Sequence, residues 1–137
     1  MRIGACLMTL ALACSPAAAQ SKSRWLRVYT YEDAVVEMEE VAFTFGAFGR
    51  VRFRTVFDEP QPVRAKPGVK YKTILEDMEF DCVERVYRVT ETALLDRKGE
   101  VIQSYKADAG APWKRVQSAM MQRLFNPACR MIAKKKL

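Results

Sequence analysis

The sequence contains no histidine, and this absence narrows the chemistry available to the protein. Histidine is the commonest general base and the commonest metal ligand in proteins. The serine-hydrolase motifs GxSxG and SxxK are missing as well, and so is a glycine-rich phosphate loop. These absences predict a protein that is not an enzyme and that uses neither a cofactor nor a metal.

Long apolar runs are scarce too, and the one that is present lies at the N-terminus. Arg2 precedes an apolar run of eleven residues, 3–13, and three alanines at 17–19 precede Gln20. This order is typical of a secretory signal peptide. Eleven residues rise only about 16 Å as a helix, far less than a hydrocarbon core of ~30 Å, so we expect no transmembrane span. We predict a signal peptide over residues 1–19, cleaved after Ala19.

Two other interpretations of the N-terminus stay open. Residues 10–13 resemble a lipoprotein box only loosely, because Leu12 stands where a small residue is usual. Export with a lipid anchor at Cys14 is therefore less favoured than soluble export after cleavage at Ala19. The other interpretation is an apolar N-terminus on a cytosolic protein. We expect an exported protein in the periplasm or on the cell surface of a Gram-negative bacterium.

The sequence has four cysteines, and their positions bear on the fold. Cys6 and Cys14 fall within the predicted signal peptide, which leaves Cys82 and Cys129 in the mature chain. An even pair of cysteines in an exported chain predicts a disulfide. The alternative is a pair of free, buried thiols.

The mature chain has the size and charge of one small basic domain. Removal of residues 1–19 leaves 118 residues with 22 basic and 16 acidic side chains. That length suits a single domain with one modest core. We expect residues 20–137 to form this domain, with its core over 25–131 and a basic tail at 132–137.

Alternation of apolar and polar residues predicts five or six strands followed by one helix. The predicted strands cover residues 25–31, 34–38, 50–57, 71–82, 83–95 and 100–106. We expect a loop or irregular strand at 43–49, a proline-rich loop at 58–68 and a hairpin turn at 96–99. This order, without βαβ alternation, predicts an α+β fold: an antiparallel β-sheet with one C-terminal α-helix packed on it.

Helical periodicity is confined to the C-terminal part of the chain. Ser118 is a candidate N-cap, and an apolar stripe follows it at Met120, Met121, Leu124, Phe125 and Ala128. We expect Pro127 to limit or kink this helix just before Cys129, and residues 134–136 to form a solvated, disordered tail. We favour the stripe as core rather than as a groove for a partner. The large aromatic residues that we also place in the core are Trp25, Tyr87 and Trp113.

Two predicted strands carry charged faces of opposite sign. The alternating positions are Arg50, Arg52 and Arg54 on one strand and Asp77, Glu79 and Asp81 on the other. If the two strands are neighbours, these side chains form cross-strand ion pairs. A catalytic carboxylate pair, as in glycoside hydrolysis, is the much weaker alternative.

The excess of positive charge predicts attraction to anionic partners. The best candidates for a continuous binding surface are Arg50, Arg52, Arg54, Arg64, Lys66, Lys70 and Lys72. We expect a protein or an anionic polymer of the host matrix or cell envelope as the partner. We expect no nucleic acid, because no nucleic-acid-binding motif is present. An ordinary solvated face is the alternative.

Several segments, taken in order, resemble the surface-adhesin protein E family. They are Trp25, the strand at 50–57 with Asp58-Glu59-Pro60 after it, Asp81-Cys82 followed by Arg85, Tyr87 and Arg88, then Gly99-Glu100-Val101, Trp113, and the helix that ends at Cys129. The resemblance covers residues 25–131. Its most specific part is the run Cys–x–x–Arg–x–Tyr–Arg with a second cysteine after a C-terminal helix.

The resemblance implies a small antiparallel sheet with a C-terminal helix and a Cys82–Cys129 bridge. The founding member is an outer-membrane lipoprotein adhesin that binds host extracellular-matrix and plasma proteins and can dimerise. By this resemblance we expect an exported, adhesin-like binding protein, with a homodimer as one of its forms. The alternative is a structural or accessory protein of the cell envelope that acts through a periplasmic partner.

Overall fold

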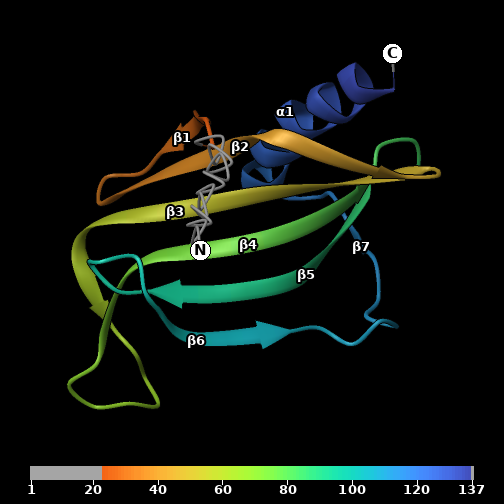
Figure 1. The fold of residues 1–137 in the computed structure, drawn as a ribbon. Coiled ribbons are helices and arrows are strands. Elements are labelled where there is room, and N and C mark those ends of the chain that lie inside the picture. Colours follow the sequence, from red (N-terminus) through yellow and green to blue (C-terminus); the bar gives the residue numbers. More distant parts are fainter. Residues whose placement is uncertain (1–22, 137) are drawn as a thin grey trace, which may run out of the picture.

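The computed structural model describes residues 23–136 and shows one antiparallel sheet with a helix across one of its faces (Figure 1). The predicted signal peptide at 1–19 and Cys14 lie outside the described residues. The elements are β1 (Trp25–Thr30), β2 (Ala34–Phe45), β3 (Phe48–Pro62), β4 (Lys70–Asp81), β5 (Val86–Leu95), β6 (Val101–Lys106), β7 (Lys114–Arg115) and α1 (Ala119–Lys135). The predicted α+β class with one C-terminal helix is confirmed.

The sheet is a meander in which consecutive strands are neighbours. Its order is β1-β2-β3-β4-β5-β6, each strand antiparallel to the next, and the short β7 pairs with the start of β5. The predicted hairpin turn between β5 and β6 is confirmed. Asp96 Oδ1 accepts hydrogen bonds from the backbone N–H groups of Lys98 and Glu100, and Gly99 has a φ of 82°.

The β2–β3 hairpin is longer than the sequence predicted. β2 continues through Phe43 and Phe45, whose partners on β3 are Arg50 and Phe48. The turn between the strands includes Gly46 with a φ of 57°, a conformation that glycine adopts without steric cost. Of the two forms predicted for 43–49, a loop or an irregular strand, the strand is the one that forms, and only residues 46–47 make the turn.

β3 also runs past its predicted end. It includes Pro60 and Pro62, although the prolines predicted a loop from residue 58 onward. The register with β4 shifts between Val56 and Gln61. Proline is tolerated at such irregularities because no ladder hydrogen bond is required from it there. The connection between β3 and β4 is thus only residues 63–69.

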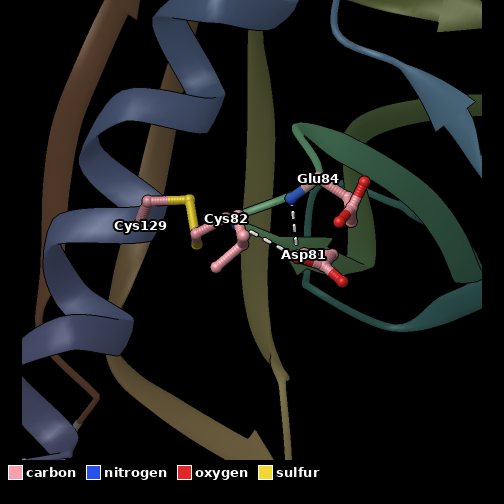
Figure 2. Close-up of a disulfide and its surroundings, with 5 residues drawn as sticks. Asp81, Cys82, Glu84 and Cys129 are labelled. Carbon is pink, nitrogen blue, oxygen red and sulfur yellow. Dashed lines mark hydrogen bonds between the residues drawn. A yellow bond between two sulfur atoms is a disulfide. The ribbon is translucent and has the colours of Figure 1, made fainter.

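A tight turn interrupts the long strand predicted at 83–95. The Oδ1 atom of Asp81 accepts hydrogen bonds of 3.0 Å from the backbone N–H groups of Val83 and Glu84 (Figure 2). Arg85 has a φ of 55°, and β5 begins only at Val86. The prediction of strand at 83–85 is wrong, because the Asp81 carboxylate stabilises a reversal of the chain at this point.

The core lies between α1 and one face of the sheet. Its buried residues are Val36, Met38, Ala42, Val51, Phe53, Met78 and Phe80 from the sheet, and Leu124, Phe125, Ala128 and Ile132 from α1. The predicted apolar stripe of the helix is therefore core, except that Met120 is exposed. The helix approaches β3 so closely that a Cβ atom on Gly49 would lie 2.5 Å from Cγ1 of Ile132.

Helix α1 begins as predicted and ends later. Ser118 is the N-cap, and its Oγ atom accepts a hydrogen bond of 3.1 Å from the N–H of Met121. Pro127 lies inside the helix without ending it. The disordered tail predicted at 134–136 is wrong, since α1 continues to Lys135. The buried Ile132 holds the last turns of the helix against the sheet.

The predicted disulfide is confirmed. Cys82 follows the end of β4 and is bonded to Cys129 of α1, with 5.8 Å between their Cα atoms (Figure 2). The bridge fastens the C-terminal half of the helix to the sheet. Among residues 23–136, no helix combines the length and the apolar character that a bilayer span requires.

Candidate functional site

The side of the sheet opposite α1 carries a dense set of charged and aromatic side chains. Neighbouring residues of a strand point to opposite faces, so the residues that alternate with buried Val51, Phe53, Met78 and Phe80 point away from the helix. We call this side the helix-free face. Its main members are Trp25, Glu37, Val41, Phe43, Phe45, Arg50, Arg52, Arg54, Asp77, Glu79 and Arg88.

The predicted ion pairs between β3 and β4 form at two positions. Arg52 pairs in register with Asp77, and its Nε and Nη2 atoms donate hydrogen bonds of 2.6 and 2.9 Å to the two carboxylate oxygens. Arg50 Nη2 lies 2.8 Å from Glu79 Oε1. The bidentate contact of Arg52 with Asp77 fixes the orientation of its guanidinium group. The cross-strand ladder is therefore confirmed for these two arginines.

The third predicted arginine finds a different partner. Arg54 pairs in register with Leu75 on β4, so no carboxylate of β4 faces it. Its Nε atom donates instead to Glu37 of β2, on its other side. Asp81, the third predicted carboxylate, is engaged by the turn after β4. With Arg88 of β5, which pairs with Glu79, the ladder thus extends across four strands rather than two.

Glu79 is the centre of this arrangement. Its side chain is almost fully buried and accepts hydrogen bonds from Arg50 and from Nε of Arg88, at 2.8 and 2.6 Å. Burial acts to raise the pKa of Glu79, but the hydrogen bonds and charges of the two arginines outweigh it and hold that pKa below its ordinary value. Glu79 is therefore ionised at neutral pH and does not suit the role of a general acid.

Arg88 is the charged partner of Glu79 that the sequence analysis did not place in the ladder. It lies opposite Glu79 in the β4–β5 register. The signal was obscured because both faces of the run at 86–95 carry apolar residues, so its charged face could not be assigned. Its alternation with Tyr87 and Val89, both packed against the core, and its place in the Cys–x–x–Arg–x–Tyr–Arg run were the available signs.

Aromatic rings cover the arginines of this face. The guanidinium carbon of Arg54 lies 4.2 Å from the ring centre of Trp25, and that of Arg88 lies 4.6 Å from Trp113. Arg50 similarly lies 5.2 Å from the ring of Phe45. The core location predicted for Trp25 and Trp113 is therefore wrong. These rings stack on charged groups of the helix-free face, in cation–π contacts.

Two hollows open on the helix-free face, and Arg50 lines both. The first has a volume of about 380 Å³ and the second about 280 Å³. The first is lined by Glu39, Val41, Phe43, Phe45, Arg50, Arg52 and Asp77. The second lies between the Glu79–Arg88 pair and residues 106–111 after β6. Exposed apolar rings therefore lie beside guanidinium and carboxylate groups whose positions are fixed.

The seven predicted basic residues fall into two groups. Arg50, Arg52 and Arg54 are on the helix-free face, each paired with a carboxylate. The others lie at the opposite end of β3 and β4: exposed Arg64 and Lys70, together with Lys66 and Lys72, which donate to backbone carbonyl oxygens. The structure therefore does not join them into one surface.

A family model for surface-adhesin protein E matches residues 25–130, which is most of the chain. The chain belongs to the surface-adhesin protein E family. The match includes both bridged cysteines and the whole charged ladder. No curated protein matches the chain.

Membership of the surface-adhesin protein E family gives the ladder a functional setting. The protein is adhesin-like, and the family suggests export and a non-enzymatic binding role. This agrees with the state of the carboxylates, since Asp77 and Glu79 are both held by arginines. The surface-adhesin fold thus presents fixed charges and exposed rings on one face, and buries its apolar core under α1 on the other.

Proposed function

We propose that this protein is exported and binds a protein or an anionic polymer of the host matrix or cell envelope through the helix-free face. The observation that carries the proposal is the pair of hollows that share Arg50. In the first hollow, the exposed rings of Phe43 and Phe45 stand next to arginines that are already held in place.

Interface physics supports this use of the face. Aromatic residues and arginine are enriched among the side chains that dominate binding energy. Ordering a long side chain on association costs free energy. The side chains of Arg50 and Arg52 are already ordered by their ion pairs in the folded protein, so binding does not have to order them again. The exposed Phe43 and Phe45 supply apolar area beside them. A partner with acidic and apolar groups would match this combination.

The binding test uses two double variants with the same chemical changes. Val41→Ser with Arg52→Gln alters the first hollow, and Val101→Ser with Arg97→Gln alters exposed residues elsewhere. Binding would be measured against a panel of immobilised matrix and plasma glycoproteins and heparin. We expect the first variant to weaken binding about tenfold, as the loss of one good interface anchor does, and the second to leave it unchanged. Equal binding by both variants would show that the partner does not bind through the helix-free face.

The location of the protein decides which partners it meets. Protease and antibody accessibility on intact cells, with lysed cells as control, separates the two cases. Accessibility on intact cells would support an adhesin that contacts extracellular macromolecules. Protection until lysis would support instead an accessory protein of the envelope, and the partner search would turn to periplasmic proteins.

A further inference from the structure

One end of the molecule brings together four segments that are far apart in the sequence. They are the β2–β3 turn, the turn at 81–85 after β4, β7, and the last turn of α1, all on the right in Figure 1. Gly49 pairs with Phe80, so the chain that leaves β4 lies beside the tip of the β2–β3 hairpin. Ile132 packs on Gly49, which brings the end of α1 to the same place. We call this the disulfide end, because Cys82 lies in it.

Large apolar side chains are exposed at the disulfide end. Phe43 is 59% exposed, Phe45 is 43% exposed, and Val83 is 83% exposed. Val83 lies in the turn that Asp81 stabilises and lines neither hollow of the helix-free face. Phe43 and Phe45 belong to the last part of β2, next to the β2–β3 turn, and Val83 belongs to the turn after β4. Several large apolar side chains exposed at one end of a molecule mark a contact surface more strongly than single ones scattered over a protein.

Basic side chains surround these apolar residues. The four segments contain six exposed basic residues, namely Arg85, Lys114, Arg115, Lys134, Lys135 and Lys136, and two acidic ones, Asp81 and Glu84. One of the acidic side chains, that of Asp81, is engaged by backbone N–H groups. The disulfide end therefore has a clear excess of positive charge.

The opposite end of the sheet has a balanced charge. Its basic residues are Arg64, Lys66, Lys70, Lys72, Arg97 and Lys98, and its acidic residues are Glu32, Asp33, Asp58, Glu59, Asp96 and Glu100. The net positive charge of the domain is thus concentrated at the end that also exposes Phe43, Phe45 and Val83. Of the two ends compared, only the disulfide end combines an excess of positive charge with these exposed apolar side chains.

We propose that the disulfide end docks on an anionic phospholipid surface. Phe43, Phe45 and Val83 would enter the interfacial region, and the lysines at 134–136 would lie against the headgroups. Apolar side chains next to a polybasic segment are the combination that holds peripheral proteins on anionic bilayers. Each lysine near such a surface contributes about fivefold in affinity. Phe43 and Phe45 also line the first hollow of the helix-free face, whereas Val83 and the three lysines line neither hollow. Val83 and the lysines therefore distinguish this docking from partner binding by the helix-free face.

The test is sedimentation of residues 20–137, which contain the whole described domain, with phosphatidylcholine vesicles that contain or lack phosphatidylglycerol. We expect binding only to the anionic vesicles, and weaker binding at high salt because exposed charges are screened. Changing Lys134, Lys135 and Lys136 together to Gln should weaken binding at least about tenfold. Val83→Ser should weaken it severalfold.

Matched control variants at the opposite end of the sheet distinguish docking by the disulfide end from a general effect of net charge or of exposed apolar area. They are the triple change of Arg64, Lys70 and Lys98 to Gln, and Val101→Ser, which affects a valine that is 62% exposed. Both should leave vesicle binding unchanged. Equal losses in test and control variants would overturn the proposal, and so would equal binding to both vesicle types. Binding to heparin without binding to anionic vesicles would also overturn it, in favour of a polymer partner.

The two proposals can fail independently. The Val41→Ser, Arg52→Gln variant tests the helix-free face and leaves Val83 and the three lysines intact. It should retain most vesicle binding while weakening binding of the macromolecular partner about tenfold. Loss of vesicle binding in the lysine variant with normal partner binding would confirm that lipid docking is a separate property.

Discussion

Glu76 and Glu79 lie three residues apart on β4 and experience opposite environments. Glu79 is on the helix-free face and is held by Arg50 and Arg88, so its pKa is lowered despite burial. Glu76 pairs in register with Phe53, on the side of the core. Within residues 23–136 its carboxylate takes part in no ion pair, and burial raises its pKa.

This difference shows that the two faces of the sheet have different roles in the molecule. The covered face is held by apolar packing against α1, and burial there raises the pKa of Glu76. On the helix-free face, arginines and carboxylates pair with one another, and aromatic rings stack on the arginines. These contacts hold the side chains in place, and within the described part of the chain no helix covers this face. The first face accounts for the fold, and the second is available for binding.

The largest expected effect comes from detaching the helix from the covered face. Changing Cys82 and Cys129 to Ser together should lower the free energy of unfolding by about 4 kcal/mol, because the bridge closes a segment of 47 residues. Denaturant unfolding of the variant and of wild type would measure this. Wild type treated with reductant is the control, and should match the variant. Unchanged stability in both cases would contradict a structural role for the bridge.

The next effect concerns the close packing of α1 on β3. Gly49→Val should cost about 3 kcal/mol, because the new side chain would overlap Ile132. Gly110→Val is the matched control, since a Cβ atom there has no neighbour within 4 Å. Thermal unfolding of both variants gives the comparison. Similar melting temperatures for the two would mean that the helix does not lie where the structure places it.

On the helix-free face, the expected effect is smaller and depends on pH. Glu79→Gln should lower the free energy of unfolding by about 2 kcal/mol at pH 7. The loss should be smaller than for breaking a fully buried ion pair, because Arg50 keeps partial contact with water. The folded-state pKa of Glu79 is lowered, so its contribution is present above the unfolded value and is lost as the pH falls through the folded one. Unfolding measured from pH 7 to pH 3 should show the two proteins converging. A constant difference would contradict the ion-pair account.

Glu76→Gln is expected to have the smallest effect, with the opposite sign. A raised pKa gives a contribution that is present below the unfolded value and is lost as the pH rises through the folded one. At neutral pH the ionised carboxylate is therefore a cost, and its removal should stabilise the protein by about 0.5–1 kcal/mol. The gain should vanish at low pH. Destabilisation at pH 7 would mean that Glu76 has a partner.

Regular alternation made much of this architecture predictable. The Arg50–Asp77 region was predicted because polar and apolar residues alternate strictly on both strands, and the register then brought opposite charges together. The disulfide followed from the number of cysteines and the expected export. The helix start followed from the Ser118 cap.

The errors arose where tertiary contacts override local composition. The rings of Trp25 and Trp113 indicated core, but arginines elsewhere in the chain provide their contacts. For residues 43–49, three aromatic residues and two glycines left both a loop and an irregular strand open, and the pairing of β2 with β3 decides for the strand. The helical end at 134–136 depends on Ile132 meeting Gly49, a contact that local composition does not encode.

The central claim is that the helix-free face is the contact surface of this adhesin-like protein. It is tested most directly by photo-crosslinking in living cells, with p-benzoylphenylalanine in place of Phe43 or, as control, of Tyr105. Both positions are exposed aromatic residues, at 59% and 66%, but only Phe43 lines a hollow of the helix-free face. The account predicts a discrete protein or glycan adduct from position 43 and none from 105. Identical adducts from both positions, or adducts from 105 alone, would contradict it.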